Sequence, residues 1–276
     1  MDALKRLREL DELIKRRMSK VKHKVAVLSG KGGVGKSTVT ANLALAIARR
    51  RGPGTVGILD ADITGASIPK LLNTRGEKLV AGPPGIIPVK GPLNVKVVSM
   101  DYLLPDDETP VIWRGPMKTM AIKQFLAEVA WGELEYLFID LPPGTGDEAL
   151  TIAQSIPGID GAVIVTIPSE VSQIVVKRAI GFCRRLNLSV IGVVENMSVF
   201  VCPRCGYVVD IFGVGGGEKI ARDMGVVFLG KIPLDPEISR YSDTGTPIVI
   251  GDPDSPVAKA FEKIAHKVEE FFKTRG

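Results

Sequence analysis

Residues 30–37 read Gly30-Lys31-Gly32-Gly33-Val34-Gly35-Lys36-Ser37 (GKGGVGKS), directly after an apolar run and before a helical pattern. This order is that of a P-loop, in which glycines let backbone N–H groups curl around phosphate oxygens. The helix N-terminus adds its partial positive charge, Lys36 contacts the outer phosphates and the Ser37 hydroxyl can bind Mg²⁺. We therefore predict a nucleoside triphosphate site with Mg²⁺, formed by residues Gly30, Lys31, Gly32, Gly33, Val34, Gly35, Lys36, Ser37 and Thr38.

Lys31 adds information that an ordinary P-loop lacks, because the position after the first glycine is usually unrestricted. A lysine here indicates a deviant Walker A loop, in which the extra lysine reaches the phosphates of a partner subunit. It would then act like a finger supplied in trans. This interpretation predicts a homodimer with two ATP molecules at its interface.

Seven apolar, β-rich runs alternate with helical patterns along the chain. Several are almost continuous in Val, Ile and Leu, as in parallel strands that are covered on both faces. We predict one doubly wound α/β domain over residues 25–276, with a mostly parallel sheet. The expected strands are 25–29, 55–60, 95–99, 136–140, 161–166, 189–195 and 226–229.

Three aspartates stand where two of these strands end. Asp60 closes the strand in ILDADI, and Asp140 closes the strand in YLFIDLPPGTGD. Carboxylates at the ends of strands beside a P-loop strand can hold Mg²⁺ or its water molecules. We predict that Asp60 and Asp140 serve the metal, that Asp62 orients the attacking water, and that the glycine-rich loop after Asp140 senses the γ-phosphate.

The net charge of +5 is concentrated in residues 1–24, a basic segment with the pattern of an amphipathic helix. Basic and acidic residues balance in the rest of the chain, which argues against nucleic acid as a partner. No apolar run is long enough to cross a membrane, and acidic residues stand where a signal peptide would be apolar. We expect a soluble cytoplasmic protein with no stable membrane association, whose N-terminal helix packs on the domain.

The two histidines, His23 and His266, are predicted to be solvated, His23 just before the first strand. With no other histidine, a Ser-His-Asp hydrolase or a His-rich metal site is excluded. Cys183 shares a helix face with apolar residues and is expected in the core. Ser255 and Pro256 are predicted to cap and start a C-terminal helix.

Cys202 and Cys205 form a CPxCG knuckle at residues 202–206, which places two thiolates on one side of a turn. A redox pair normally starts a helix, whereas Tyr207-Val208-Val209 is typical of a strand. A tetrahedral thiolate site needs about four ligands, so two subunits would complete one. The pattern suits either zinc or a 4Fe–4S cluster and does not choose between them.

Taken in order, these motifs resemble those of the Mrp/ApbC group of iron-sulfur cluster carrier ATPases, over roughly residues 20–250. The motifs are GKGGVGKS, LDADI, WRGPM (113–117), IDLPPGTGD, ENMS (195–198), CPRCG and IPLDPEI. The group belongs to the MinD-like (SIMIBI) P-loop NTPases. The family usually has Tyr-Gly-Pro where this chain has Thr64-Gly65-Ala66.

The resemblance implies a cytosolic homodimer that hydrolyses ATP, assembles a 4Fe–4S cluster between its subunits and passes it to apoproteins. It also implies that Lys31 is the trans lysine, Asp62 the switch I carboxylate and Asn196 an adenine contact. One rival is a MinD- or ParA-like spatial-organisation ATPase with a structural zinc knuckle. Another is an ATP-driven electron donor resembling nitrogenase iron protein, which the close spacing of the two cysteines disfavours.

Overall fold

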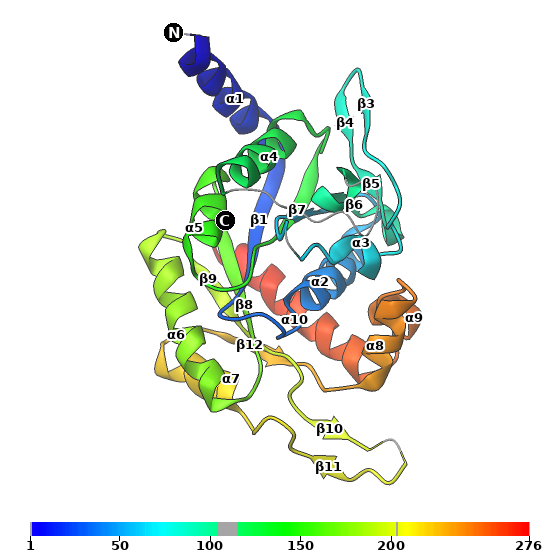
Figure 1. Cartoon of the computed structure of the whole chain (residues 1–276). Helices are drawn as coiled ribbons and strands as arrows, with labels where there is room; N and C mark the ends of the chain where they lie inside the picture. The colour runs from blue at the N-terminus through cyan, green and yellow to red at the C-terminus, as the bar shows by residue number, and fades with distance from the viewer. Residues whose placement is uncertain (1, 64, 104–114, 203, 276) are drawn as a thin grey trace.

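A computed structural model describes residues 2–63, 65–103, 115–202 and 204–275. Its centre is an eight-stranded sheet with the order β12-β9-β8-β1-β7-β2-β6-β5, and only β5 runs antiparallel to its neighbour (Figure 1). The predicted doubly wound, mostly parallel sheet is confirmed. Its strands are β1 (Val21–Ser29), β2 (Val56–Asp60), β5 (Val89–Lys90), β6 (Lys96–Ser99), β7 (Leu134–Asp140), β8 (Gly161–Thr166), β9 (Val190–Glu195) and β12 (Phe228–Lys231).

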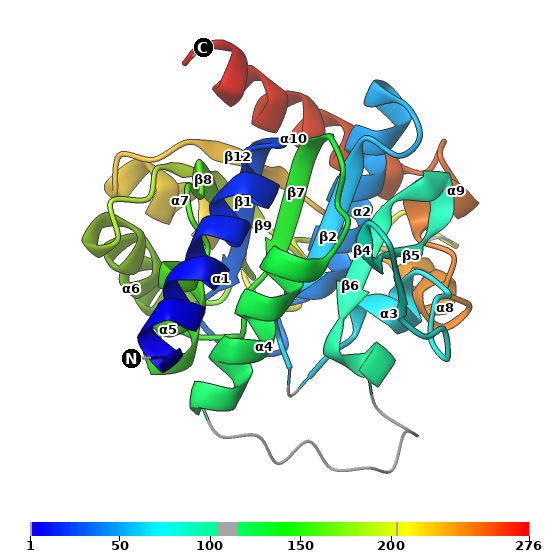
Figure 2. The same cartoon turned by 90° about the horizontal axis from the view of Figure 1, so that it is seen from above.

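Helices cover both faces of the sheet, as Figure 2 shows from above. Buried side chains on the two faces form two separate hydrophobic clusters, which is why the central strands are apolar throughout. One face carries α1 (Asp2–Met18), α4 (Gly115–Glu128), α5 (Asp147–Ser155), α6 (Glu170–Arg185) and α7 (Gly216–Asp223). The other carries α2 (Lys36–Arg51), α3 (Ile68–Leu71), α9 (Ile248–Gly251) and α10 (Pro256–Lys273), with α8 (Pro236–Asp243) beside α9.

The chain reverses its direction of travel across the sheet at β1, which lies between β7 and β8. In open α/β sheets this switch point opens a crevice at the carboxyl ends of the strands. The P-loop follows β1 directly and therefore lies in that crevice. The predicted C-terminal helix is confirmed: the Ser255 hydroxyl oxygen accepts a hydrogen bond from the Ala258 amide at 3.1 Å, at the start of α10.

Two small antiparallel hairpins extend from the sheet. One pairs β3 (Val80–Gly82) with β4 (Gly85–Ile87), and the other pairs β10 (Phe200–Val201) with β11 (Val208–Val209). The second hairpin projects away from the body of the molecule and carries the CPxCG motif at its tip (Figure 1).

The first strand starts earlier than predicted, at Val21 rather than at residue 25. His23 is therefore inside β1, and the prediction that it is solvated is wrong. Its ring stacks on Phe272 of α10 with a centroid distance of 4.2 Å, and burial lowers its pKa. His266 is exposed as predicted and lies 3.2 Å from a Glu270 carboxylate oxygen.

The last predicted strand, 226–229, is displaced by two residues, since β12 begins at Phe228. The Val226 amide donates to the Ala221 carbonyl oxygen at 2.9 Å, so this residue closes the end of α7 instead of entering the sheet. The other expected strands agree with the structure to within two residues at each end.

Helix α1 packs against α4 through its buried Ile14 and Met18. Arg17 extends beyond it and donates from Nη2 to the Pro84 carbonyl oxygen at 2.6 Å. Lys123 of α4 lies 3.0 Å from Asp11. Within the described ranges, none of the helices combines the length and the apolar character needed to span a membrane.

Candidate functional site

The P-loop begins where β1 ends and closes at the first residue of α2. Gly33 (φ 77°) and Gly35 (φ 78°) adopt left-handed conformations, which L-residues with a side chain rarely adopt. A Cβ on Gly30 would lie 2.6 Å from the Val175 backbone of α6, so a side chain here would collide with that helix. These glycines fix the path of the loop and leave backbone N–H groups free to meet phosphate.

The loop borders a cavity of about 250 Å³ at the switch point of the sheet. Ser29 contributes a buried hydroxyl to it, which has no hydrogen-bond partner among the residues that the structure describes. The other lining residues are Gly32, Gly33, Gly35, Lys36, Ser37, Thr38, Asp62, Gly65, Ser67 and Pro143.

Lys36 and Asp140 form the electrostatic centre of the site. The Lys36 ammonium lies 2.6 Å from the Asp140 carboxylate and 3.8 Å from that of Asp62. Ser37 and Thr40 donate hydroxyl hydrogen bonds to the two Asp140 oxygens at 2.5 and 2.7 Å. The sequence analysis assigned no role to Thr40, although it follows Lys36 by one helical turn and so lies on the same face of α2.

Asp60, like Asp140, lies deeper than Asp62. It is 1% exposed, pairs with Asp140 in the register of β2 and β7, and accepts a hydrogen bond from the Ser99 hydroxyl at 3.1 Å. Burial, and then the neighbouring Asp140 charge, raise the pKa of Asp60 well above its ordinary value. Neither Asp60 nor Asp140 lines the cavity, but Asp140 accepts hydrogen bonds from Lys36 and Ser37, which do.

Asp62 does line the cavity, as its position on a loop after β2 predicts. Its Oδ1 accepts a hydrogen bond from the Gly65 amide at 3.2 Å, which holds the carboxylate in place. Burial raises the pKa of Asp62, and the Lys36 ammonium acts in the opposite direction. The loop after Asp140 is tied back to β1 by a bond from the Gly144 amide to the Ser29 carbonyl oxygen at 2.9 Å.

The donors in this crevice fit Mg²⁺, which prefers hard oxygen ligands. The Ser37 hydroxyl and the carboxylates of Asp140 and Asp62 lie around Lys36 and can supply such oxygens. A cation held here would neutralise charge on the phosphate oxygens of a bound nucleotide.

Lys31 is half-buried, lies outside the lining of its own chain's cavity, and makes neither an ion pair nor a side-chain hydrogen bond within the described residues. Asn196 lies beneath the loop, where its Nδ2 donates to the Val34 carbonyl oxygen at 2.9 Å. It also blocks any side chain at Gly35, because a Cβ there would lie 2.3 Å from Asn196 Nδ2. Its role as an adenine contact stays a prediction.

We expect Lys36→Ala to weaken ATP binding by about 10- to 100-fold, because a charge-assisted contact contributes about 1.5–3 kcal/mol. Asp62→Ala should instead leave binding nearly unchanged and slow hydrolysis by about 10²- to 10⁴-fold, through loss of the group that orients water. Nucleotide titrations and turnover assays on both variants separate the two effects. Wild-type hydrolysis by Asp62→Ala would remove this residue from the catalytic role.

The two cysteines of the knuckle lie at the tip of the β10–β11 hairpin, and the strand predicted after them is confirmed as β11. Gly206 has a φ of 70°, and its amide donates to the Cys202 carbonyl oxygen at 2.9 Å, closing the turn. Hydrogen bonds from the backbone amides of Cys205 and Arg204 lower the pKa of the Cys202 thiol, which favours the thiolate that binds metal. Pro203 lies outside the described residues, as do Thr64, Trp113 and Arg114 of the sequence motifs.

Cys183 contrasts with this pair. It is fully buried in α6, as predicted, and burial raises its pKa to about 12. Its thiol is therefore unsuited to binding metal. Within the described residues no group of three or more His, Cys, Asp or Glu side chains gathers in a metal-binding arrangement.

Large apolar side chains are exposed on the hairpin and on the segment that follows it. The most exposed are Tyr207 at 71% and Val214 at 70%. Exposed apolar residues that gather in one region mark a surface that another molecule covers. The others in this group are Val201, Val208, Ile211 and Phe212.

Glu195 links the two ends of the hairpin segment, and the residue after it contacts the P-loop. This role was not predicted from the sequence. Its side chain is fully buried and accepts hydrogen bonds from the Ser198 hydroxyl and the Gly217 amide, both at 2.6 Å. Ser198 leads into β10 and Gly217 opens α7 after β11, so one carboxylate holds both ends of the hairpin segment. The next residue, Asn196, contacts the P-loop. An acidic residue within ENMS at the end of a predicted strand was the available signal.

We expect Glu195→Ala to lower the free energy of unfolding by about 2–4 kcal/mol, because it leaves two buried donors unpaired. Glu195→Gln should lose less, since one oxygen remains. Glu218→Ala is the matched control on α7: its ion pair with Lys231 is exposed and screened by solvent, so a much smaller loss is expected. Urea denaturation of the three variants measures the difference. Equal losses in Glu195→Ala and Glu218→Ala would refute the buried junction.

Comparison with known proteins identifies the family. The family described as "NUBPL iron-transfer P-loop NTPase", of the ParA group, matches residues 20–269. This chain belongs to that family. The iron-sulfur cluster carrier protein of Saccharolobus solfataricus is 57% identical over 94% of the chain and 87% of its own length.

Solved structures agree with this assignment. A nucleotide-binding protein of Archaeoglobus fulgidus in complex with ADP has a TM-score of 0.79 and 41% identity, over 91% of this chain and 96% of that one. The Pyrococcus furiosus cell division ATPase MinD has a TM-score of 0.68 and 25% identity, over 90% and 99%. The chain is thus a P-loop NTPase with a MinD-like fold, and its much higher identity to named carriers makes the MinD-like function the weaker alternative.

Proposed function

We propose that this chain is a cytoplasmic, homodimeric ATPase that carries a 4Fe–4S cluster and transfers it to apoproteins. The observation that carries the proposal is an exposed CPxCG hairpin in a member of an iron-transfer family. Glu195 holds both ends of the hairpin segment, and the next residue, Asn196, contacts the P-loop. The relatives named iron-sulfur cluster carrier proteins support the cargo.

The ATPase half of the proposal assigns a separate task to each P-loop neighbour. Lys36 would bind the outer phosphates, and Ser37 and Asp140 would hold Mg²⁺, with Asp60 buried next to Asp140 in the register of β2 and β7. Asp62 lines the same cavity and orients the attacking water toward the γ-phosphate. When ATP arrives, Lys36 exchanges its contact with Asp140 for the phosphates, which frees that carboxylate for the cation.

Ligand count supports the dimer. A closed thiolate site takes about four sulfurs, and each chain offers the pair Cys202 and Cys205. Two hairpins brought together supply the full set and cover the exposed apolar side chains around them. The cluster then lies between subunits, where a change in the arrangement of the two subunits can retain or release it.

The coupling between the nucleotide site and the cysteine hairpin depends on two residues that are adjacent in the chain. Asn196 contacts the P-loop through the Val34 carbonyl oxygen, and Glu195 holds the entry to β10 and the start of α7. A shift of the P-loop on ATP binding or hydrolysis therefore reaches the hairpin along one short, buried path. Buried, fully paired networks move as units, which suits transmission between the two sites.

The test is an ultraviolet-visible spectrum of protein purified without oxygen, together with iron, sulfide and zinc analysis. We expect broad absorption near ~400 nm and about four irons and four sulfides per dimer. One zinc per dimer with no acid-labile sulfide would overturn the carrier proposal and leave an ATPase with a zinc knuckle. Such a result would leave the family assignment unchanged.

A further inference from the structure

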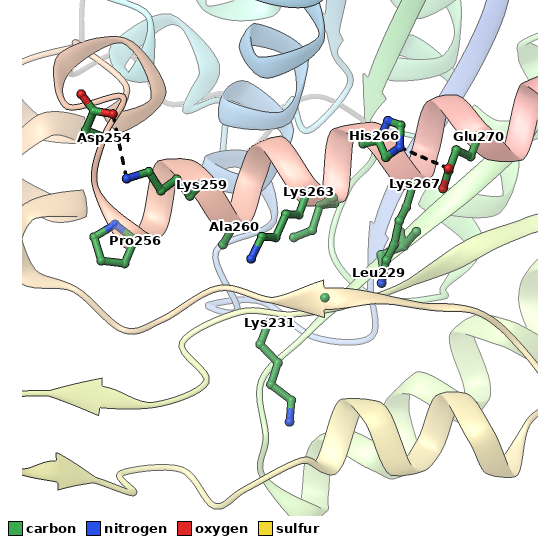
Figure 3. A pocket seen from close by; sticks show the side chains of 12 residues that line it. Leu229, Lys231, Asp254, Pro256, Lys259, Ala260, Lys263, His266, Lys267 and Glu270 are labelled. Carbon is green, nitrogen blue, oxygen red and sulfur yellow. Dashed lines mark ion pairs between the residues drawn. The ribbon is translucent and has the colours of Figure 1, made fainter.

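A groove of about 630 Å³ separates the edge strand β12 from helix α10, on the opposite side of β9 from the P-loop strand (Figure 3). Among the described strands, β12 pairs only with β9, so its outer edge faces this groove. The lining residues are Leu229, Gly230, Lys231, Asp254, Pro256, Lys259, Ala260, Lys263, Ile264, His266, Lys267 and Glu270.

Lysines dominate the rim of the groove. Lys259, Lys263 and Lys267 follow one another at four-residue intervals on α10 and so share one face of the helix, whereas the side chain of Lys231 on β12 points away from α10 (Figure 3). The acidic residues of the lining are Asp254 and Glu270, and Glu218 of α7 pairs with Lys231, so the surplus positive charge of the rim lies on α10.

Lys231 forms an ion pair with Glu218 of α7 at 3.0 Å, whereas the three lysines on α10 are weakly paired or unpaired within the described chain. Lys259 is 61% exposed and 3.9 Å from Asp254, and Lys263 has no ion pair within the described chain. Lys267 donates to the Phe228 carbonyl oxygen of β12 at 3.1 Å and so covers part of the strand edge. A positive rim of this kind attracts an anionic partner over a distance of about 10 Å at ordinary salt.

The floor of the groove determines which kind of anion fits. It consists of Leu229, Pro256, Ala260 and Ile264, which are apolar. The lining contains no Arg, Phe, Tyr or Trp, and its one ring, that of His266, lies 3.2 Å from a Glu270 carboxylate oxygen, so it offers little for bases to stack on. An apolar floor under a lysine rim matches a peptide that alternates apolar and acidic side chains.

We propose that this groove docks an acidic, extended segment of the apoprotein that receives the cluster. This inference rests on the proposed carrier function and adds the recognition site for the recipient. Its apolar side chains would cover the floor, and its carboxylates would pair with Lys259 and Lys263.

The position of the groove supports this role. Beyond Lys231, the Ile232 amide donates to the Glu195 carbonyl oxygen at 2.8 Å, and the Ser198 amide donates to the Ile232 carbonyl oxygen at 2.9 Å. Leu234 forms a bridge with Phe200, the first residue of β10. The strand that borders the groove thus continues to the base of the cysteine hairpin, so a recipient held there is anchored at the foot of the hairpin that carries the cysteines.

The test uses the full chain without cluster and a fluorescein-labelled peptide that alternates Glu with Val, measured by fluorescence anisotropy. We expect saturable binding that weakens with salt, and a loss of about 10-fold or more in the double variant Lys259→Glu/Lys263→Glu. Lys90→Glu is the matched control, an exposed lysine on β5 at the opposite edge of the sheet, and should bind like the wild type. A peptide with Gln in place of Glu should bind weakly.

Two outcomes would overturn the docking site: equal binding by wild type and the double variant, or stronger binding of a poly-dT oligonucleotide than of the acidic peptide at the same lysines. Cluster transfer to an acidic apoprotein should be slowed in the double variant, with its cluster content and ATP turnover unchanged. Because peptide binding is measured without cluster, its failure does not touch the carrier proposal. A zinc-only protein would refute the carrier and leave the peptide result standing.

Discussion

Lys31→Ala is expected to bind ATP almost as well as the wild type and to hydrolyse it about 10³- to 10⁵-fold more slowly, the contribution typical of a finger supplied in trans. The physical reason is position. Within the part of the chain that the structure describes, Lys31 neither lines the phosphate cavity nor forms an ion pair, whereas Lys36 lines that cavity and pairs with Asp140. Nucleotide titration and steady-state turnover on the same preparation separate binding from rate.

Mixing variants tests whether Lys31 acts across the dimer. In a dimer of one Lys31→Ala chain and one Asp62→Ala chain, one site combines an intact Asp62 with an intact partner lysine. Random exchange at equal concentrations makes half of the dimers mixed, each with one active site, so turnover should recover to about a quarter of wild type. If exchange is confirmed and turnover does not recover, Lys31 acts within its own chain.

The arrangement of the sheet could be predicted because its signals are local. Continuous apolar runs identify buried parallel strands, and the position of GKGGVGKS between one such run and a helix identifies the P-loop. The start of β1 was missed because Lys22 and Lys24 interrupt the apolar pattern. Lys24 is nevertheless buried, with its ammonium 3.8 Å from Asp160, so tertiary pairing outweighs the local preference.

The sequence also predicts which residues form the nucleotide site, but not how deeply each side chain is buried. Asp60 and Asp62 are two positions apart in the chain, yet only Asp62 reaches the cavity, because Ser99 on the neighbouring strand holds Asp60 below the surface. Glu195 was missed for a related reason. Its partners Ser198 and Gly217 are brought together by the hairpin between them, and their separation in sequence gives no sign of this contact.

Cys202→Ala or Cys205→Ala is expected to abolish cluster binding altogether, seen as loss of the reconstituted absorption near ~400 nm and of the iron. Each substitution removes two of the four thiolates of the dimer, and no group of metal-binding side chains elsewhere in the described residues can replace them. Transfer to an apoprotein should fail in both variants. ATP hydrolysis should largely survive, because the thiolates lie at the tip of a hairpin outside the phosphate cavity.

Cys183→Ala is the matched control, since it removes a thiol of the same chemistry from the same chain. Its sulfur is fully buried and its pKa is raised to about 12, so it should leave absorption and iron content intact while lowering stability by about 1 kcal/mol. Loss of the cluster in Cys183→Ala while the protein stays folded would contradict a site built from the two hairpins. Retention of four irons per dimer in Cys205→Ala would contradict it equally, because two remaining thiolates cannot close a site that requires about four ligands.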